Sequence, residues 1–477
     1  MALSRPLLRV RPESVGIAPS SVTDFMKAAS DSPTGLHSFM LLRHGRVAAE
    51  AHWRPYDSAL RHMLFSLSKS FTSTAIGLAV AERLLTVDDA VISFFPEKRL
   101  NDGPNMRAMR VRHLLSMSTG HAEDAMGRLR GAEDGDWVQS FLSLEVEHEP
   151  GTRFVYNSGA SYMLSAIIQR VTGQPLLDYL QPRLLAPLGI DGAEWETCPR
   201  GIHAGGWGLS LMTEDIARFG QLYLQQGQWE GAQLLPKAWV KEATSRHIAN
   251  GDGGESDWKQ GYGYQFWICR HGAYRGDGAY GQFCVVLPEQ EAVIAITSGV
   301  RKNLQDVLDL VWTHLLPGMK QGELPPDDEQ FGIMTDTAQS LAYAPLQSDL
   351  KTDTAAKVSG AAYVMDANDH YKTISFRFEP DLCRIAYTNG AGEHQIQCGM
   401  GRWAIERSPL DSYPMMAASG QWLEADTFEM EWRRIETPFI IHAVCKFAGD
   451  RASIQIRHQV NKIDVGEPIL LAGTKER

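Results

Sequence analysis

The first candidates for chemistry are serine and lysine residues three positions apart. This Ser-x-x-Lys spacing occurs three times, as Ser66/Lys69, Ser256/Lys259 and Ser348/Lys351. Only Ser66 begins a long apolar stretch, residues 66–85, which predicts a helix buried inside a large domain. The second pair lies among glycines and the third in a stretch without periodicity, so neither is expected in a site that excludes water. Ser66 and Lys69 are therefore the candidate reactive pair.

The spacing within this pair suits nucleophilic catalysis. Helix residues three apart share one face, so the Ser66 hydroxyl and the Lys69 ammonium are expected within hydrogen-bonding reach. Burial lowers the proton affinity of a lysine, so a neutral Lys69 would accept the Ser66 proton and create a nucleophile without histidine. The unpaired N–H groups at the helix start would favour an anion there. The alternative is a helix-capping serine with a solvated lysine, the more common meaning of an isolated match.

Several other segments follow this pair in a characteristic order. Phe154-Val-Tyr-Asn-Ser-Gly159 opens an expected helix, and Gly276-Asp-Gly278 lies on an expected late strand. The segments between and around them are Leu114–Gly120, Pro187–Gly189 and Gly205–Gly220. Together with Ser66-Leu-Ser-Lys69, they make residues 15–315 similar to the serine beta-lactamase and penicillin-binding-protein superfamily, in its branch of class C beta-lactamases, esterases and D-aminopeptidases.

The resemblance implies both a fold and a mechanism. The fold is α/β (α+β), with an antiparallel sheet flanked by helices, an all-helical lobe, and a catalytic cleft between them. Ser66 would be acylated, Lys69 would deprotonate it, and Tyr156 would pass a proton to the leaving group and help activate the deacylating water. The backbone N–H groups of Ser66 and Ala279 would form the oxyanion hole, worth about 3–4 kcal/mol per donor. Taken alone, Tyr156 would more often be a packed aromatic residue.

Two departures from the family pattern bear on the substrate. The family places Asn two residues after the tyrosine, whereas Ser158 stands there, and the role is not transferred to the neighbouring Asn157. Where relatives carry Lys or His with Thr, this chain has Gly276 and the acidic Asp277. An anionic penicillin would meet a carboxylate there, at a Coulomb cost, which favours neutral or amine-bearing substrates. The alternative for Asp277 is an exposed turn residue at a strand edge.

Weaker predictions concern substrate contacts. The candidate substrate-binding residues are Ser158, Asp277, Gly278, Tyr280, Gln282 and Trp207. An acyl or aryl pocket could be walled by Trp207, Trp258, Tyr264, Trp267 and Tyr280, although aromatic residues in strands more often belong to the core. His121, Glu123 and Asp124 are interpreted as a loop without metal-ligand spacing. No metal and no cofactor are expected.

The order of predicted elements divides the chain into three parts. Residues 1–318 form the beta-lactamase-like domain, beginning with a hairpin whose strands, 37–43 and 46–52, meet at His44-Gly45. Residues 319–346 are rich in Gly, Pro, Asp and Glu and predict a linker. Residues 347–477 show a period of two and an Asn389-Gly390 hairpin signal, which predicts an antiparallel sheet or small barrel.

Composition excludes several classes of protein. The 477 residues carry 46 basic and 57 acidic side chains, a net charge of −11, which argues against a nucleic-acid partner. No apolar run is long enough for a membrane span and no signal-peptide core follows Met1, so we expect a cytoplasmic protein without a membrane partner. The six cysteines lack C-x-x-C spacing and are expected to be reduced, although Cys269 and Cys284 could meet across a hairpin.

The sequence thus predicts a serine hydrolase that cleaves small-molecule esters or amides through an acyl-enzyme on Ser66. Two alternatives stay open. One is a beta-lactamase or D-amino-acid-specific peptidase of the same fold. The other is a non-catalytic, penicillin-binding-like protein that senses or binds ligands. Whether the chain forms a homodimer is open as well.

Overall fold

A six-stranded antiparallel sheet is the centre of the larger part of the molecule. The computed structural model describes residues 6–408 and 413–476. The strand order is β2-β1-β11-β10-β9-β8, so the first hairpin joins the late strands. The strands are β1 (Leu36–Arg43), β2 (Arg46–His52), β8 (Trp267–Ile268), β9 (Tyr274–Gly278), β10 (Gln282–Leu287) and β11 (Ala292–Ser298). Arg43 pairs with Arg46, which confirms the hairpin predicted around His44-Gly45.

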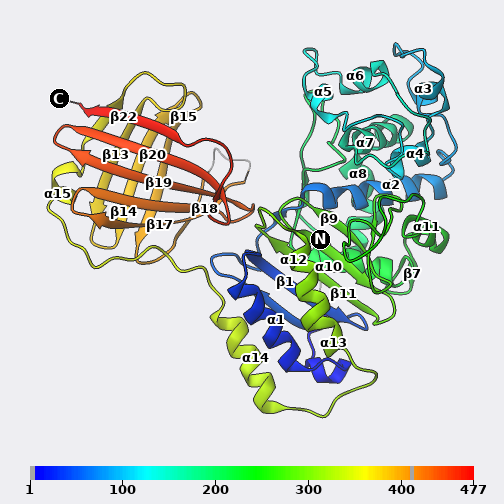
Figure 1. Ribbon diagram of the computed structural model, residues 1–477, viewed down its shortest axis with the longest axis horizontal. Helices are drawn as coiled ribbons and strands as arrows, with labels where there is room; N and C mark the ends of the chain where they lie inside the picture. The colour runs from blue at the N-terminus through cyan, green and yellow to red at the C-terminus, as the bar shows by residue number, and fades with distance from the viewer. Residues whose placement is uncertain (1–5, 409–412, 477) are drawn as a thin grey trace.

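Both faces of this sheet are covered by helices (Figure 1). Successive residues of a strand point to opposite faces, and in β1 both sets are apolar: Phe39 and Leu41 join one core, Met40 and Leu42 the other. The first core includes α1 (Pro19–Asp31) and α12 (Gln305–Leu310), and the second includes α2 (Ser68–Ala81) and α10 (Thr213–Leu224). The larger unit, residues 6–318, is therefore a sheet between two helical layers.

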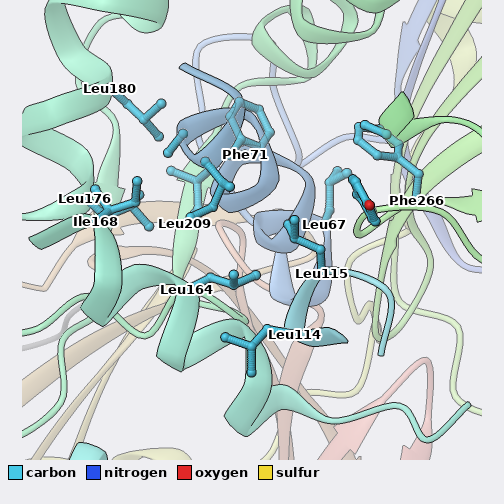
Figure 2. Packing of buried hydrophobic residues seen from close by; sticks show 14 of the residues in the cluster. Leu67, Phe71, Leu114, Leu115, Leu164, Ile168, Leu176, Leu180, Leu209 and Phe266 are labelled. Atoms are coloured by element: carbon cyan, nitrogen blue, oxygen red, sulfur yellow. The ribbon is translucent and has the colours of Figure 1, made fainter. Parts of the chain in front are cut away.

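The helical lobe stands on the α2 side of the sheet. Its helices are α3 (Pro104–Ala108), α4 (Val111–Leu115), α5 (Met126–Arg130), α6 (Trp137–Ser143), α7 (Ser158–Thr172), α8 (Leu176–Leu180) and α9 (Ala186–Leu188). Figure 2 shows Leu67 and Phe71 of the α2 region packed among leucines of the lobe. Shorter elements of the unit are β3 (His62–Met63), β4 (Glu194–Trp195), β5 (Leu209–Leu211), β6 (Gln228–Trp229), β7 (Ala232–Gln233), α11 (Lys237–Ala243) and α13 (Leu316–Gly318). The lobe thus fixes α2 from one side while the sheet fixes it from the other.

The stretch predicted as a linker contains a helix. α14 (Asp328–Ser340) is preceded by Asp327, whose side chain caps the first turn by accepting the Gln330 N–H. Its Met334 is buried in the same core as α1. The helix was missed because Met334 is its one buried residue, which leaves little apolar periodicity to detect.

The C-terminal part is a closed barrel of nine strands, as predicted for residues 347–477. The strands are β12 (Ala362–Met365), β13 (Thr373–Glu379), β14 (Leu382–Asn389), β15 (Gly392–Met400), β17 (Met415–Glu424), β18 (Thr427–Arg434), β19 (Phe439–Ala448), β20 (Arg451–Val460) and β22 (Ile469–Lys475). A parallel pairing of β15 with β17 closes the ring. β16 (Ala404–Arg407) and β21 (Ile463–Asp464) pair outside it, and α15 (Thr354–Val358) precedes it. Asn389 pairs with Gly392, which confirms the hairpin predicted at Asn389-Gly390.

The cysteines are all buried and free. Cys269 lies in the core on the α1 side of the sheet and Cys284 in the core on the α2 side, so the pairing left open for them does not occur. Within residues 6–408 and 413–476, no helix has both the length and the apolar character needed to cross a membrane.

Candidate functional site

Ser66 lies in a short 3₁₀ turn, Phe65–Leu67, that leads directly into α2. The sequence predicted that Ser66 would begin the long helix itself, whereas the α-helix begins two residues later, at Ser68. Leu64 and Leu67 are fully buried on either side, while Ser66 is half-buried. The flanking leucines therefore fix the backbone around a serine that is itself only half-buried.

Lys69 is buried against three oxygen atoms. Its Nζ donates to Ser66 Oγ at 3.1 Å, to Ser158 Oγ at 3.2 Å and to the carbonyl oxygen of Gly206 at 2.7 Å. Burial lowers the pKa of Lys69 to about 7, against the opposing influence of the carboxylates of Asp124 and Asp277. A large share of Lys69 is then neutral at pH 7 and able to accept the Ser66 proton.

The other two Ser-x-x-Lys pairs do not share this environment. Lys259 is exposed and pairs with Asp252. Ser348 and Lys351 are both exposed. The structure therefore separates the three pairs as the sequence context predicted, because only Ser66 and Lys69 lie in a packed interior.

Tyr156 lies beside the pair, two residues before α7. Its ring stacks on Trp267 with centroids 5.5 Å apart, and Lys69 Nζ is 4.9 Å from the centre of the Tyr156 ring. Burial raises the pKa of Tyr156 well above its ordinary value, with Asp277 adding to the rise and a hydrogen bond with Ser66 opposing it. The phenol therefore stays protonated over the range in which Lys69 loses its proton. This division suits Lys69 to the role of base and Tyr156 to that of proton donor.

The start of α7 is held by two side chains that the sequence analysis did not assign to the site. Asn157, fully buried, caps the helix by accepting the Ala160 N–H and also accepts the Ala125 N–H. Asp124 accepts the N–H of Ser158 at 2.9 Å. The loop interpretation of Asp124 holds, but this loop orients the helix that presents Ser158 to Lys69. Asn157 is turned into the helix cap, so it does not occupy the place of the family asparagine.

Glycines allow the backbone to approach Lys69 and Ser66 closely. A Cβ on Gly206 would lie 3.2 Å from Lys69 Nζ. On β9, a Cβ on Gly276 would lie 2.5 Å from the Leu67 side chain, and one on Gly278 would lie 2.1 Å from the Leu64 carbonyl oxygen. The strand therefore packs against the Ser66 turn with no room for side chains between them.

The second predicted oxyanion donor follows this strand. Ala279 is exposed and lies in a tight turn closed by a hydrogen bond from the Gly281 N–H to the Gly278 carbonyl. The side-chain amide of Gln282 donates to the carbonyls of Ala279 and Ser298. Gln282 is fully buried, so its placement supports the turn rather than offering its amide to a substrate.

Asp277 is not the exposed turn residue considered as an alternative. It lies on β9, is 7 % exposed, and pairs with Arg275, whose Nε is 3.0 Å from its carboxylate. Burial raises the pKa of Asp277, and Arg275 opposes the rise. The sequence analysis missed Arg275, a fully buried side chain two residues away on the same face of the strand. The negative charge expected to meet a substrate is therefore largely balanced from within the protein.

The five aromatic residues proposed as a pocket wall do not form one surface, although Trp258 and Trp267 contact each other. Trp267 stacks on Tyr156, and Trp258 covers the Arg275 guanidinium at 4.2 Å. Tyr280 packs against Phe65. Tyr264 stacks instead on His247, and the Trp207 ring packs against Arg130 in the helical lobe.

A sixth aromatic residue lies closer to the chemistry than most of these five. Tyr262 is fully buried, packs at right angles to Trp267 and lies near Tyr156 and Asp277. The sequence offered no signal for it, because its neighbours are brought to it from the segment before α7 and from β9.

The acidic, histidine and cysteine side chains are the groups that a metal ion would need in a suitable arrangement. In the described ranges, no group of three or more His, Cys, Asp and Glu side chains is arranged to hold a metal ion.

The sheet, the helical lobe and a serine–lysine–tyrosine cluster between them define the fold class of serine beta-lactamases and penicillin-binding proteins. The sequence profile of the beta-lactamase family matches residues 35–315, more than half of the chain. The chain belongs to the beta-lactamase family of hydrolases.

Individual relatives agree with this assignment. The 6-aminohexanoate-dimer hydrolase of Paenarthrobacter ureafaciens is 26% identical over 277 residues, which cover 54% of this chain and 71% of that protein. A solved structure titled as a 6-aminohexanoate-dimer hydrolase from Bacillus anthracis has a TM-score of 0.54 at 22% identity, covering 63% of this chain and 82% of the other. A beta-lactamase-type structure from Bacteroides dorei gives a TM-score of 0.51 at 18% identity, covering 68% and 99%. The two structural matches support the fold.

Proposed function

We propose that the protein is a serine hydrolase that cleaves small esters or amides through a covalent acyl-enzyme on Ser66. The observation that carries the proposal is the buried Lys69 amine, hydrogen-bonded to Ser66 Oγ at 3.1 Å and with its pKa lowered to about 7. A serine needs an adjacent base to act as a nucleophile near neutral pH. Lys69 supplies that base, and a merely structural lysine would gain nothing from losing its charge.

The proposed reaction has two halves. Lys69 Nζ takes the proton of Ser66 as Oγ attacks the substrate carbonyl carbon, and the resulting oxyanion is stabilised by the N–H groups of Ser66 and Ala279. Collapse of this intermediate breaks the bond to the alcohol or amine, which leaves with a proton delivered through Tyr156. Water then attacks the acyl-enzyme, gives up a proton to the Lys69–Tyr156 pair, and releases the acid and free Ser66.

The charged groups around Lys69 favour a substrate amine over a carboxylate through the exposed Asp124, because Arg275 already balances most of the Asp277 charge. Asp124 and Asp277 both act on Lys69, and Arg275 is directed to Asp277 and away from open solvent. The relative from Paenarthrobacter ureafaciens is named a 6-aminohexanoate-dimer hydrolase. We therefore rank amine-bearing amides and neutral esters above beta-lactams, whose carboxylate would enter a site with no counter-charge directed toward it.

The test combines a covalent probe with a substrate panel. Intact-protein mass spectrometry after a fluorophosphonate should show one adduct on the wild type and none on Ser66→Ala. Turnover of p-nitrophenyl esters and of amino-acid amides should depend on Ser66 and exceed nitrocefin turnover. The absence of both a Ser66-dependent adduct and any turnover would defeat the proposal. Efficient nitrocefin hydrolysis would leave the serine mechanism standing and reverse the substrate ranking.

A further inference from the structure

The barrel touches the larger unit, residues 6–318, next to Ser66. The turn between β18 and β19 is buried, with Thr437 fully so and Glu436 nearly so. The Glu436 carbonyl oxygen accepts the N–H of Met63 at 2.8 Å, three residues before Ser66. The barrel is therefore bonded to the chain segment that leads into the nucleophile.

Phe439, the first residue of β19, completes an aromatic cluster beside the site. Its ring centroid is 5.6 Å from that of Tyr280 and 6.2 Å from that of Phe65, and Phe65 and Tyr280 are 5.1 Å apart. All three contacts are edge-to-face, the favourable arrangement for aromatic rings. We call Phe65, Tyr280 and Phe439 the aromatic triad.

The two triad residues of the larger unit, Phe65 and Tyr280, have strained backbones. Phe65 has φ +48° and Tyr280 has φ +64°, both in the left-handed region that disfavours large side chains. Phe65 immediately precedes Ser66, and Tyr280 immediately follows Ala279. The strained positions therefore adjoin the two predicted oxyanion donors. Such strain, of order 1–3 kcal/mol per residue, persists only where the surroundings hold the conformation.

The triad contacts add to hydrogen bonds that hold these conformations. Ser68 Oγ donates to the Phe65 carbonyl, and the Val300 N–H and Ser298 Oγ donate to the Tyr280 carbonyl. Each strained residue is anchored through its own ring, and Phe439 of the barrel closes the cluster. If Phe65 or Tyr280 returned to a right-handed φ, the peptide leading into Ser66 or the turn carrying Ala279 would rotate. The N–H groups would then no longer converge on one oxygen atom.

We propose that Phe439 is a positioning residue of the active site, through which the barrel holds the oxyanion hole in its reactive geometry. The inference rests on the serine-hydrolase function proposed above. Because the oxyanion exists only in the transition state and intermediate, a displaced hole lowers kcat rather than ground-state binding.

The test compares Phe439→Ala with wild type in the full-length chain. We expect kcat for an ester to fall about 10- to 100-fold, less than or comparable to the loss of one oxyanion donor, with KM changed by less than about threefold. The rate constant of Ser66 phosphonylation should fall by a similar factor, because the phosphonyl oxygen occupies the same hole. Phe439→Tyr, which keeps the ring, should retain most of the activity.

A matched control separates positioning from general destabilisation. Tyr371 is a half-buried barrel aromatic whose ring packs on Tyr387. Tyr371→Ala should leave kcat within about twofold of wild type even where it lowers the melting temperature, since no catalytic group depends on it. If Phe439→Ala does not fold, Tyr280→Ala removes the same contact from the other side, and the same loss of kcat is expected.

Each outcome either supports or overturns the positioning role of Phe439. Unchanged kcat in a folded Phe439→Ala or Tyr280→Ala protein overturns the inference, as does a rise in KM alone, which would make the triad a substrate-binding surface. A wild-type protein with neither Ser66-dependent labelling nor turnover would defeat the proposed function and this inference together. Loss of kcat in Phe439→Ala with rescue by Phe439→Tyr supports the positioning role.

Discussion

Two buried basic side chains, Lys69 on α2 and Arg275 on β9, are held in opposite ways. Lys69, on α2, has neutral partners: two hydroxyls and a carbonyl. Arg275, on β9, is fully buried as well but contacts the carboxylate of Asp277. Burial opposes the charge of both. Neutral oxygens do not compensate for it, so the pKa of Lys69 falls to about 7, whereas Cys269 and Asp277 hold the pKa of Arg275 above its ordinary value. The counter-ion, rather than the depth of burial, therefore decides which of the two side chains can lose its proton.

The largest effect is expected from replacing Lys69 with a side chain that cannot lose its positive charge. Lys69→Arg keeps a positive charge but cannot lose its proton, because a guanidinium remains protonated at all ordinary pH values. We expect kcat/KM to fall by about 1,000-fold or more, as expected on removing a general base. Ester turnover and circular dichroism give the two readouts. Activity within tenfold of wild type in a folded variant would show that Lys69 is not the base.

The next effect comes from removing the counter-ion of the second cation. Asp277→Asn leaves Arg275 buried without its carboxylate, which should cost about 3–5 kcal/mol of unfolding free energy. Urea denaturation measures it. The control is Asp252→Asn, which removes an exposed partner of Lys259 and should leave the denaturation midpoint unchanged. Equal behaviour of the two variants would mean that Arg275 does not need Asp277.

The pH dependence of the wild type tests the lysine side of the comparison. Activity requires neutral Lys69, whose pKa is lowered to about 7, so kcat/KM should fall about tenfold per pH unit below pH 7 and level off above it. Burial raises the pKa of Tyr156, so no alkaline loss is expected before pH 10 from its ionisation. A profile that is flat from pH 5 to 8 would contradict the assignment of Lys69 as base.

The smallest effect concerns a distant carboxylate. Asp124 raises the pKa of Lys69 against the effect of burial. Asp124→Asn should therefore move the acidic limb of the kcat/KM profile to lower pH, by a few tenths of a unit, because an exposed charge is screened by salt. The neighbouring exposed residue provides the control: Glu123→Gln should leave the limb in place. A shift to higher pH would show that Asp124 acts through the α7 cap instead of through its charge.

Much of the fold was predictable from local pattern. The hairpin at His44-Gly45 and the one at Asn389-Gly390 are both present, because turn chemistry and alternating residues act over a few positions. α14 was missed, since a helix with few buried residues leaves a weak periodic signal. Ser66, Lys69 and Tyr156 were selected from spacing and family resemblance, and the structure brings all three together.

The parts of the site that escaped prediction depend on long-range contacts. Arg275 adjoins Asp277 in sequence, but its full burial follows from the packing of β9 beneath Trp258. Asp124 accepts a hydrogen bond from Ser158, 34 positions later in the sequence. Phe439 packs on Phe65, which lies several hundred positions earlier. Nothing in local composition signals such pairs.

The sequence by itself determined which groups are available: a serine and a lysine three apart at the start of an apolar helical segment, a tyrosine at a helix entry, and a period-two tail. Only the tertiary structure decided their protonation states and the groups that surround them. A pKa depends on desolvation and on neighbouring charges within a few ångströms, and both arise when distant segments pack. The same packing brings Phe439 of the barrel against Phe65, the residue before Ser66, so a domain that the sequence left without a role borders the proposed active site.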